Sequence, residues 1–112
     1  MKFNIIAFFL LVLALSPVSF AADSVFLDVR TPQEFAEGHI QKALNLDFYN
    51  SNFEKEIKAL DKNKEYKIYC RSGNRSQKTY ELMKALGFKK IENIGGFSSL
   101  RSAFKTCEGL SC

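Results

Sequence analysis

The chain has 112 residues, of which 46% are hydrophobic and 25% are charged, and its formal net charge at pH 7 is +4. This length suits one small domain with its own core, and the sequence contains neither internal repeats nor low-complexity segments. The 16 Lys and Arg residues are scattered along the chain, so the charge favours small anions and does not indicate a nucleic-acid-binding surface.

The first 21 residues have the organisation of a secretory signal peptide. Lys2 precedes an apolar run over residues 5–15, and Pro17 breaks that run. Ser19 and Ala21 place small residues three positions and one position before a cleavage site, so we expect cleavage after Ala21 and a periplasmic or secreted protein. The run is short for a membrane span, which needs about 20 residues, although an uncleaved anchor remains the alternative.

The next residues predict a buried strand followed by a capped helix. Val25–Arg30 is almost continuously apolar at its start, which is typical of a parallel strand buried on both faces. Thr31 has the position of a helix N-cap, and Pro32 suits the first turn. Glu34 completes a capping box with Thr31, and Gly38 ends the helix.

Strand and helix patterns then alternate to the end of the domain. We expect strands at Ala43–Leu46, Tyr66–Tyr69 and Phe88–Ile94, and helices at Asn52–Leu60, Ser76–Leu86 and Phe97–Phe104. Gly87 is the expected stop of the second of these helices. This order predicts an α/β fold with a mostly parallel sheet, right-handed crossovers and helices on both faces, spanning residues 22–106.

Cys70 lies at the mouth of a short loop between a strand and a helix, where parallel α/β proteins place ligand sites. A thiol reacts as its thiolate, and at a pKa of about 8.5 only a small fraction is ionised at neutral pH. The helix amino terminus and the cations Arg71 and Arg75 favour the thiolate. Gly73 lets successive N–H groups form an anion-binding nest. We interpret Cys70 as a nucleophile, and a buried structural thiol is the alternative.

The loop resembles the active-site loop of the rhodanese family, Cys-Arg-Ser-Gly-x-Arg followed by Ser. A second stretch, Asp28–Phe35 with residues 38–40, is similar to the amino-terminal signature of that family, and Asn93–Phe97 resembles its later glycine pair. The resemblance extends from Val25 to about Phe104 and implies the rhodanese-like single-domain fold with a persulfide at Cys70. The residues that it implies for binding an anionic sulfur donor are Arg71, Ser72, Gly73, Asn74 and Arg75.

The activity implied by the resemblance is sulfur transfer. The Cys70 thiolate takes the outer sulfur of a donor such as thiosulfate and passes it to cyanide, a thiol or a protein, in two half-reactions. Neither a metal nor an organic cofactor is needed, and we expect a monomer without nucleic-acid or membrane partners. A phosphatase or arsenate reductase with a loop longer by one residue is one alternative. A persulfide carrier or binding module is another.

The polar residues near the first strand have structural explanations. For Asp28 and Arg30 we expect a supporting role at the strand end, with an ion pair between Arg30 and Glu34. His39 is the only histidine, so we expect it to pack or to bond to backbone, with no partner cluster and no metal site.

The segment 107–112 lies outside the family pattern. Three cysteines make one pair and one single thiol, so we expect a Cys107–Cys112 disulfide and a free Cys70. The pair is either a simple staple of the tail or a second thiol site that resolves a sulfur species on Cys70 or exchanges with a redox partner.

Overall fold

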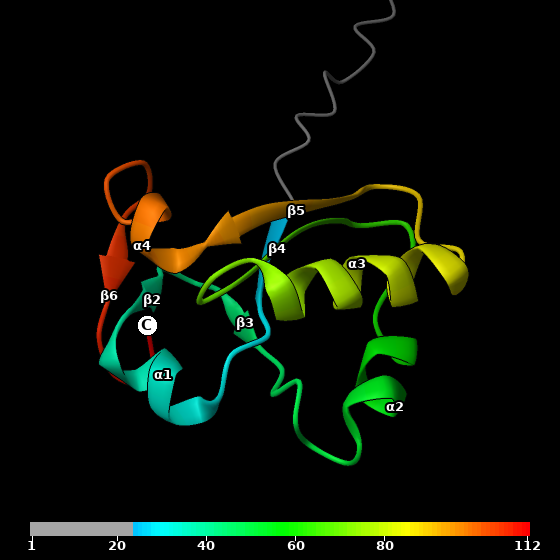
Figure 1. Cartoon of the computed structure of the whole chain (residues 1–112), viewed down its shortest axis with the longest axis horizontal. Helices are drawn as coiled ribbons and strands as arrows, with labels where there is room; N and C mark the ends of the chain where they lie inside the picture. Colours follow the sequence, from blue (N-terminus) through cyan, green and yellow to red (C-terminus); the bar gives the residue numbers. More distant parts are fainter. Residues whose placement is uncertain (1–23) are drawn as a thin grey trace, which may run out of the picture.

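Four parallel strands form the central sheet of the computed structural model, which describes residues 24–112 (Figure 1). Their order is β3-β1-β4-β5, so β1 and β4 are the inner strands. The strands are β1 (Ser24–Asp28), β3 (Leu44–Asn45), β4 (Glu65–Cys70) and β5 (Ile91–Gly96). The expected mostly parallel α/β fold is therefore confirmed. The predicted signal peptide lies outside the described residues and stays a prediction.

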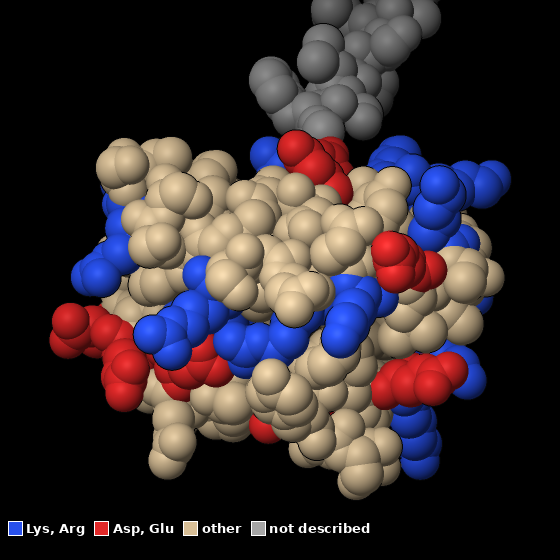
Figure 2. Space-filling view, viewed as in Figure 1, with Lys and Arg blue, Asp and Glu red and all other residues tan. Residues whose placement is uncertain are grey.

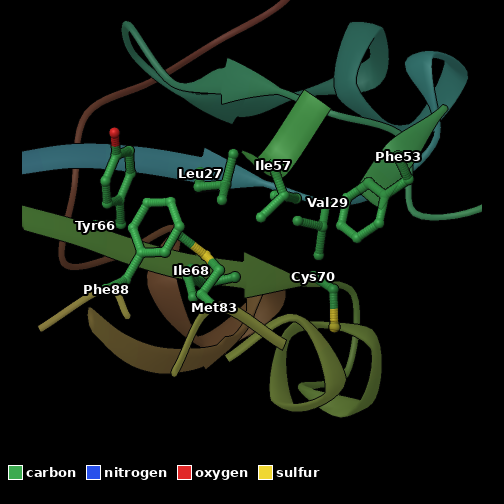
Figure 3. Packing of buried hydrophobic residues seen from close by; sticks show 9 residues of the cluster. All are labelled: Leu27, Val29, Phe53, Ile57, Tyr66, Ile68, Cys70, Met83 and Phe88. Carbon is green, nitrogen blue, oxygen red and sulfur yellow. The ribbon is translucent and has the colours of Figure 1, made fainter. Parts of the chain in front are cut away.

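Helices cover both faces of this sheet. They are α1 (Pro32–Glu37), α2 (Phe53–Lys58), α3 (Asn74–Ala85) and α4 (Phe97–Leu100). Because side chains alternate along a strand, Ile68 and Cys70 point to the α2–α3 side and the intervening Tyr69 points to the α4 side. The larger core cluster, drawn in Figure 3, contains Leu27, Val29, Phe53, Ile57, Tyr66, Ile68, Cys70, Met83 and Phe88. The smaller cluster contains Ile40, Tyr69, Phe97 and Leu100.

A second, two-stranded sheet ties the end of the chain to the domain. β2 (His39–Ile40) pairs antiparallel with β6 (Thr106–Cys107), so the boundary expected between residues 106 and 107 falls inside a strand. The Lys42 N–H also donates to the Cys112 carbonyl at 2.7 Å. The sequence did not predict this sheet, because a two-residue strand has no measurable periodicity. In addition, the register partners His39 and Cys107 lie 68 positions apart in the chain.

Several element boundaries differ from the sequence prediction. α3 begins at Asn74 because Gly73 adopts a left-handed conformation, with φ 94°, and serves as its N-cap. β5 begins at Ile91 rather than Phe88, although Phe88 is buried in the core. The last helix has only the four residues of α4 and is followed by turns. Apolar spacing identifies buried faces, whereas backbone hydrogen bonds decide where an element ends.

An ion pair holds α1 against α3. The predicted capping box is present, since the Glu34 N–H donates to Thr31 Oγ1 at 3.3 Å and Glu34 Oε1 accepts from the Thr31 N–H at 3.2 Å. The same carboxylate accepts two bonds from Arg75, at 2.8 and 3.1 Å. The predicted Arg30–Glu34 pair is wrong, because the Arg30 side chain is buried and pairs with Asp28 at 2.7 Å.

Within residues 24–112, no helix has the length and apolar character that a membrane span requires.

Gly96 has no room for a side chain, because β5 runs directly against the loop that follows β4. A Cβ at Gly96 would lie 2.6 Å from the Arg71 carbonyl oxygen and 3.2 Å from Ser72 Cα. We expect Gly96→Ala to cost about 1–3 kcal/mol of unfolding free energy by overpacking and to change the alkylation rate of Cys70 several-fold. Gly87→Ala is the control for general destabilisation. A side chain at its φ of 93° strains the backbone but meets no neighbouring atom. Denaturant unfolding and alkylation kinetics check both; equal alkylation rates in the two variants would contradict the close packing.

The Glu34–Arg75 pair predicts an acid-dependent loss of stability. Hydrogen bonds from Arg75, followed by those from Thr31, lower the pKa of Glu34 from 4.5 to about 2 despite partial burial. A depressed carboxyl pKa stabilises the fold above pH 4.5, and that stabilisation disappears as the pH falls toward 2. We expect Glu34→Gln, which preserves the capping box, to be less stable than the parent at neutral pH and equally stable near pH 2. Glu54→Gln breaks only an exposed pair with Lys58 and should show no such difference. Urea unfolding across this pH range is the measurement, and a constant gap for Glu34→Gln would refute the role of the charge.

Candidate active site

The sulfur of Cys70 lies in a cradle of hydrogen-bond donors at the carboxyl end of β4. Cys70 Sγ accepts the Gly73 N–H at 3.0 Å and the Ser76 N–H at 3.4 Å, and the Ser76 hydroxyl lies 3.3 Å away. The left-handed conformation of Gly73 turns the chain so that these donors converge on one atom. The geometry of the predicted nest is therefore present. The sulfur is not at the mouth of the loop as expected, because Cys70 is completely buried.

These donors favour the thiolate form of Cys70. Burial acts in the opposite direction and would by itself raise the pKa of the thiol. Hydrogen bonds from the Ser76 hydroxyl and from the N–H groups of Ser76, Ser72 and Gly73 outweigh burial, so the pKa of Cys70 lies below its ordinary value. The loop can therefore hold a negative charge on a sulfur atom that water does not reach.

A hydrogen-bonded chain behind Cys70 fixes the position of the Ser76 hydroxyl. Ser76 Oγ lies between the sulfur and Asn93, and it donates to Asn93 Oδ1 at 2.7 Å. Asn93 also accepts the Gly95 N–H at 3.0 Å and donates to the Gly73 carbonyl at 3.3 Å. Asn93 thus connects β5 to both ends of the cradle.

The Ser76 hydroxyl has only one hydrogen to share between Asn93 and Cys70. When it donates to Asn93, the Cys70 thiol can donate to Ser76; when Cys70 is ionised, the hydroxyl hydrogen can turn to the sulfur. Neither Ser76 nor Asn93 was predicted as a site residue. Ser76 was recognisable from its place directly after the loop pattern. Asn93 begins the stretch that resembles the family's glycine pair, but no local pattern indicated that its side chain contacts the cysteine loop.

The two arginines of the loop have different environments. Arg75 forms the two bonds to Glu34 and lies over the Tyr49 ring at 5.5 Å, although its charge still acts on Cys70. Arg71 is exposed and lines a cavity of about 630 Å³ together with Ser72 and Arg101. In the view of Figure 2, basic side chains form a band across the middle of the molecule, with acidic side chains beside it. Arg71, rather than Arg75, is therefore the loop cation open to an incoming anion.

Asp28 and Arg30 form a buried pair beneath this cavity. Arg30 donates from Nε and Nη2 to the Asp28 carboxylate and from Nη2 to the Gly38 carbonyl at 2.6 Å. Its guanidinium lies 4.3 Å from the centre of the Phe97 ring. The pair joins the end of β1 to the end of α1 and supports one wall of the cavity.

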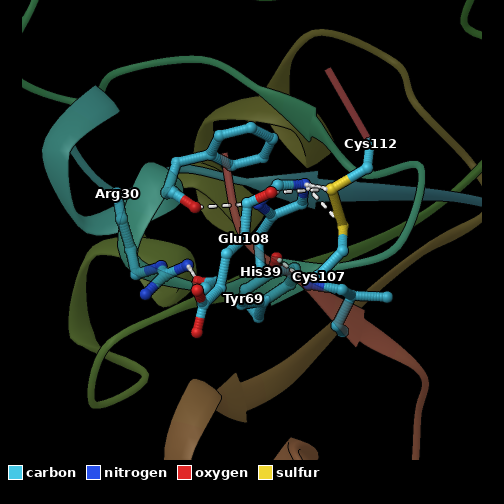
Figure 4. Close-up of a disulfide and its surroundings, with 9 residues drawn as sticks. Arg30, His39, Tyr69, Cys107, Glu108 and Cys112 are labelled. Atoms are coloured by element: carbon cyan, nitrogen blue, oxygen red, sulfur yellow. Dashed lines mark hydrogen bonds between the residues drawn. A yellow bond between two sulfur atoms is a disulfide. The ribbon is translucent and has the colours of Figure 1, made fainter. Parts of the chain in front are cut away.

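Cys107 and Cys112 form the expected disulfide, and Cys70 is the free cysteine. As expected, His39 bonds to backbone, with Nδ1 2.7 Å from the Phe35 carbonyl oxygen (Figure 4). The prediction that His39 has no partner cluster is wrong, because its Nε2 lies 3.2 Å from Cys107 Sγ. The β2–β6 pairing brings these residues together across 68 positions, which no local pattern in the sequence indicates.

The disulfide and Cys70 lie on different sides of the central sheet. Cys70 belongs to the cluster under α2 and α3. The disulfide begins at Cys107, which is part of β6 in the small sheet. In that sheet the Ile40 N–H donates to the Tyr69 hydroxyl, which belongs to the cluster under α4. The structure therefore does not bring the disulfide and the Cys70 sulfur into one site.

Comparison with known proteins identifies a single family. The model of the rhodanese-like domain matches residues 18–103. The chain is 31% identical to the thiosulfate sulfurtransferase PspE of Escherichia coli K12, over 80% of this chain and 86% of that protein. Among solved structures, a rhodanese with anions from E. coli superposes with a TM-score of 0.66 at 28% identity, covering 77% of this chain and 99% of that chain. A rhodanese-related protein from Thermoplasma volcanium gives a TM-score of 0.66 at 29% identity, covering 77% and 85% of the two chains.

The family match covers most of the chain and includes both sequence signatures and the cysteine loop. This protein belongs to the rhodanese-like domain family.

Proposed function

We propose that the protein is a sulfurtransferase that carries sulfane sulfur as a persulfide on Cys70. The observation that carries the proposal is the convergence of the Gly73 N–H, the Ser76 N–H and the Ser76 hydroxyl on one buried sulfur. Such a cradle stabilises an anion on the thiolate before transfer and on the persulfide afterwards. The similarity to PspE, named a thiosulfate sulfurtransferase, supports the same activity.

The first half-reaction loads the cysteine. The Cys70 thiolate attacks the outer sulfur of thiosulfate, the bond between the two thiosulfate sulfurs breaks, and sulfite leaves with that electron pair. Cys70 then carries a persulfide with one negative charge, so charge is conserved. In the second half-reaction, cyanide or a thiolate attacks the outer sulfur, and the electron pair returns to Cys70. Two separate half-reactions through a covalent intermediate give ping-pong kinetics.

Charge around the loop selects an anionic donor. Arg71 faces the cavity, and Arg101 adds a second cation to its wall. Arg75 is partly neutralised by Glu34, so its contribution is to hold the loop and to act on Cys70 at a distance. A dianion that enters the cavity therefore meets Arg71 and Arg101 rather than Arg75.

Two alternatives remain in view. A phosphatase would need a cradle for a tetrahedral phosphate, whereas four residues between Cys70 and Arg75 make a tighter loop than the family phosphatases use. A persulfide carrier would load a sulfur in the same way but release it only to a dedicated partner. Thiosulfate:cyanide turnover that exceeds aryl phosphate turnover favours the transferase over the phosphatase. Loading without steady-state turnover would indicate the carrier.

Incubation with thiosulfate should load one sulfur atom on Cys70. Mass spectrometry of the intact protein should show a gain of ~32 Da that cyanide removes. Cys70→Ser should show no gain. Cys107→Ser/Cys112→Ser, which leaves Cys70 as the one thiol, should load like the parent. Loading of Cys70→Ser, or a parent protein that stays unloaded while its thiol is reduced, would exclude the proposal.

Replacing Ser76 with Ala should weaken the thiolate without removing the nucleophile. The hydroxyl of Ser76 lowers the pKa of Cys70, so its loss raises that pKa and leaves less thiolate at neutral pH. We expect the rate of loading by thiosulfate at pH 7 to fall roughly three- to tenfold and to recover as the pH is raised. Ser102→Ala changes an exposed serine outside the site and is the matched control. A pH–rate profile of Ser76→Ala that overlays the profile of the parent would contradict this role.

A further inference from the structure

His39, Cys107 and Cys112 form a second cluster of reactive side chains, separate from the Cys70 loop. The imidazole nitrogen and the two sulfurs lie within 4.8 Å of one another (Figure 4). One imidazole and two thiolates are a ligand set that Zn²⁺ accepts, with a fourth position left open. We propose that reduction of the Cys107–Cys112 disulfide converts this cluster into a binding site for a thiophilic metal ion such as Zn²⁺.

The imidazole of His39 is already oriented as a ligand. Its Nδ1 lies 2.7 Å from the Phe35 carbonyl oxygen, which can only accept, so Nδ1 carries the hydrogen, and in the neutral ring Nε2 presents a lone pair. The Phe35 ring stacks on the imidazole at 3.5 Å and fixes its plane. A backbone carbonyl on the second ring nitrogen is the usual support of a metal-bound histidine.

The lone pair of Nε2 has no hydrogen to accept in the oxidised protein. Among the described residues its neighbours are Cys107 Sγ at 3.2 Å and Cys112 Sγ at 3.9 Å, and disulfide sulfurs carry no hydrogen. His39 is completely buried, so water does not replace the missing donor. A buried acceptor without a donor is unfavourable, and a metal ion bound to the reduced sulfurs would satisfy it.

Backbone contacts hold the three ligand residues in place without the disulfide. Cys107 is the register partner of His39 in the β2–β6 pair, and the Cys112 carbonyl accepts the Lys42 N–H at 2.7 Å. The Cα atoms of the two cysteines are 6.2 Å apart. Two thiolates on one tetrahedral Zn²⁺ stand about 3.8 Å apart, since each Zn–S bond is about 2.3 Å, so rotation of the side chains suffices. Both cysteines are only partly buried, which leaves the ion a route of entry.

The conversion needs a two-electron reductant of the disulfide, such as a dithiol. A dithiol transfers two electrons and two protons to the disulfide and becomes a disulfide itself, which leaves two thiols at Cys107 and Cys112. Zn²⁺ then displaces both thiol protons and takes the lone pair of His39 Nε2. Oxidation of the two sulfurs would expel the ion. The oxidation state of the disulfide therefore controls the metal site.

Cobalt titration tests the site with a visible probe. The full chain carrying Cys70→Ser is used, so that the only thiols are Cys107 and Cys112. After reduction by a phosphine and its removal, Co²⁺ should bind at one equivalent with thiolate-to-cobalt charge-transfer absorption, and Zn²⁺ should displace it. The oxidised protein should show no such absorption. Adding Cys112→Ser should weaken binding by about tenfold or more, because loss of an outer-shell partner alone costs that much.

The ligation of His39 is measured on the native ring, because replacing a buried residue endangers the fold. His39 is the only histidine, so the imidazole resonances belong to it without further assignment, and the nitrogen that keeps its hydrogen is Nδ1. Zn²⁺ should shift the ¹⁵N resonance of Nε2 in the reduced protein and leave Nδ1 protonated. Absence of thiolate–cobalt absorption, equal affinity in Cys112→Ser, or an unchanged Nε2 resonance would overturn the proposal.

Discussion

The hydrogen bonds to the Cys70 sulfur are the constraint around which the loop is built. Burial opposes a negative charge on that atom, and the donors of Gly73, Ser72 and Ser76 reverse the balance. Each donor depends on a different feature of the fold. The positive φ of Gly73 turns the loop, the start of α3 presents its free N–H groups, and Asn93 on β5 positions the hydroxyl of Ser76. The chemistry proposed for Cys70 requires all three at once.

The central sheet separates the free thiol of Cys70 from the disulfide. Cys70 is enclosed by hydrogen-bond donors on the side of α2 and α3. The two arginines of its loop have different partners. Arg75 is tied to Glu34 and holds α3 to α1, whereas Arg71 is open to the cavity. The disulfide lies at the small sheet beside His39. This separation argues against direct exchange between the disulfide and Cys70 in this conformation.

The sequence predicted those parts of the molecule that depend on local patterns. The capping box of Thr31 and Glu34, the glycine at the loop and the cysteine at the end of β4 were all recognisable from neighbouring residues. Contacts between distant residues were not. Glu34 was paired with the nearer Arg30, but burial of Arg30 beside Asp28 leaves Glu34 to Arg75, 41 residues away. The Asn93 contact and the His39 cluster were missed for the same reason: each depends on strand pairing.

The most direct test of this account is the ionisation of Cys70 itself. In the oxidised protein Cys107 and Cys112 form the disulfide, so the ultraviolet absorbance of the thiolate reports one titrating thiol. A pH titration of the folded protein should give a pKa below that of an ordinary cysteine and a higher value after Ser76→Ala. A pKa above the ordinary value would mean that burial dominates and that the loop does not stabilise an anion.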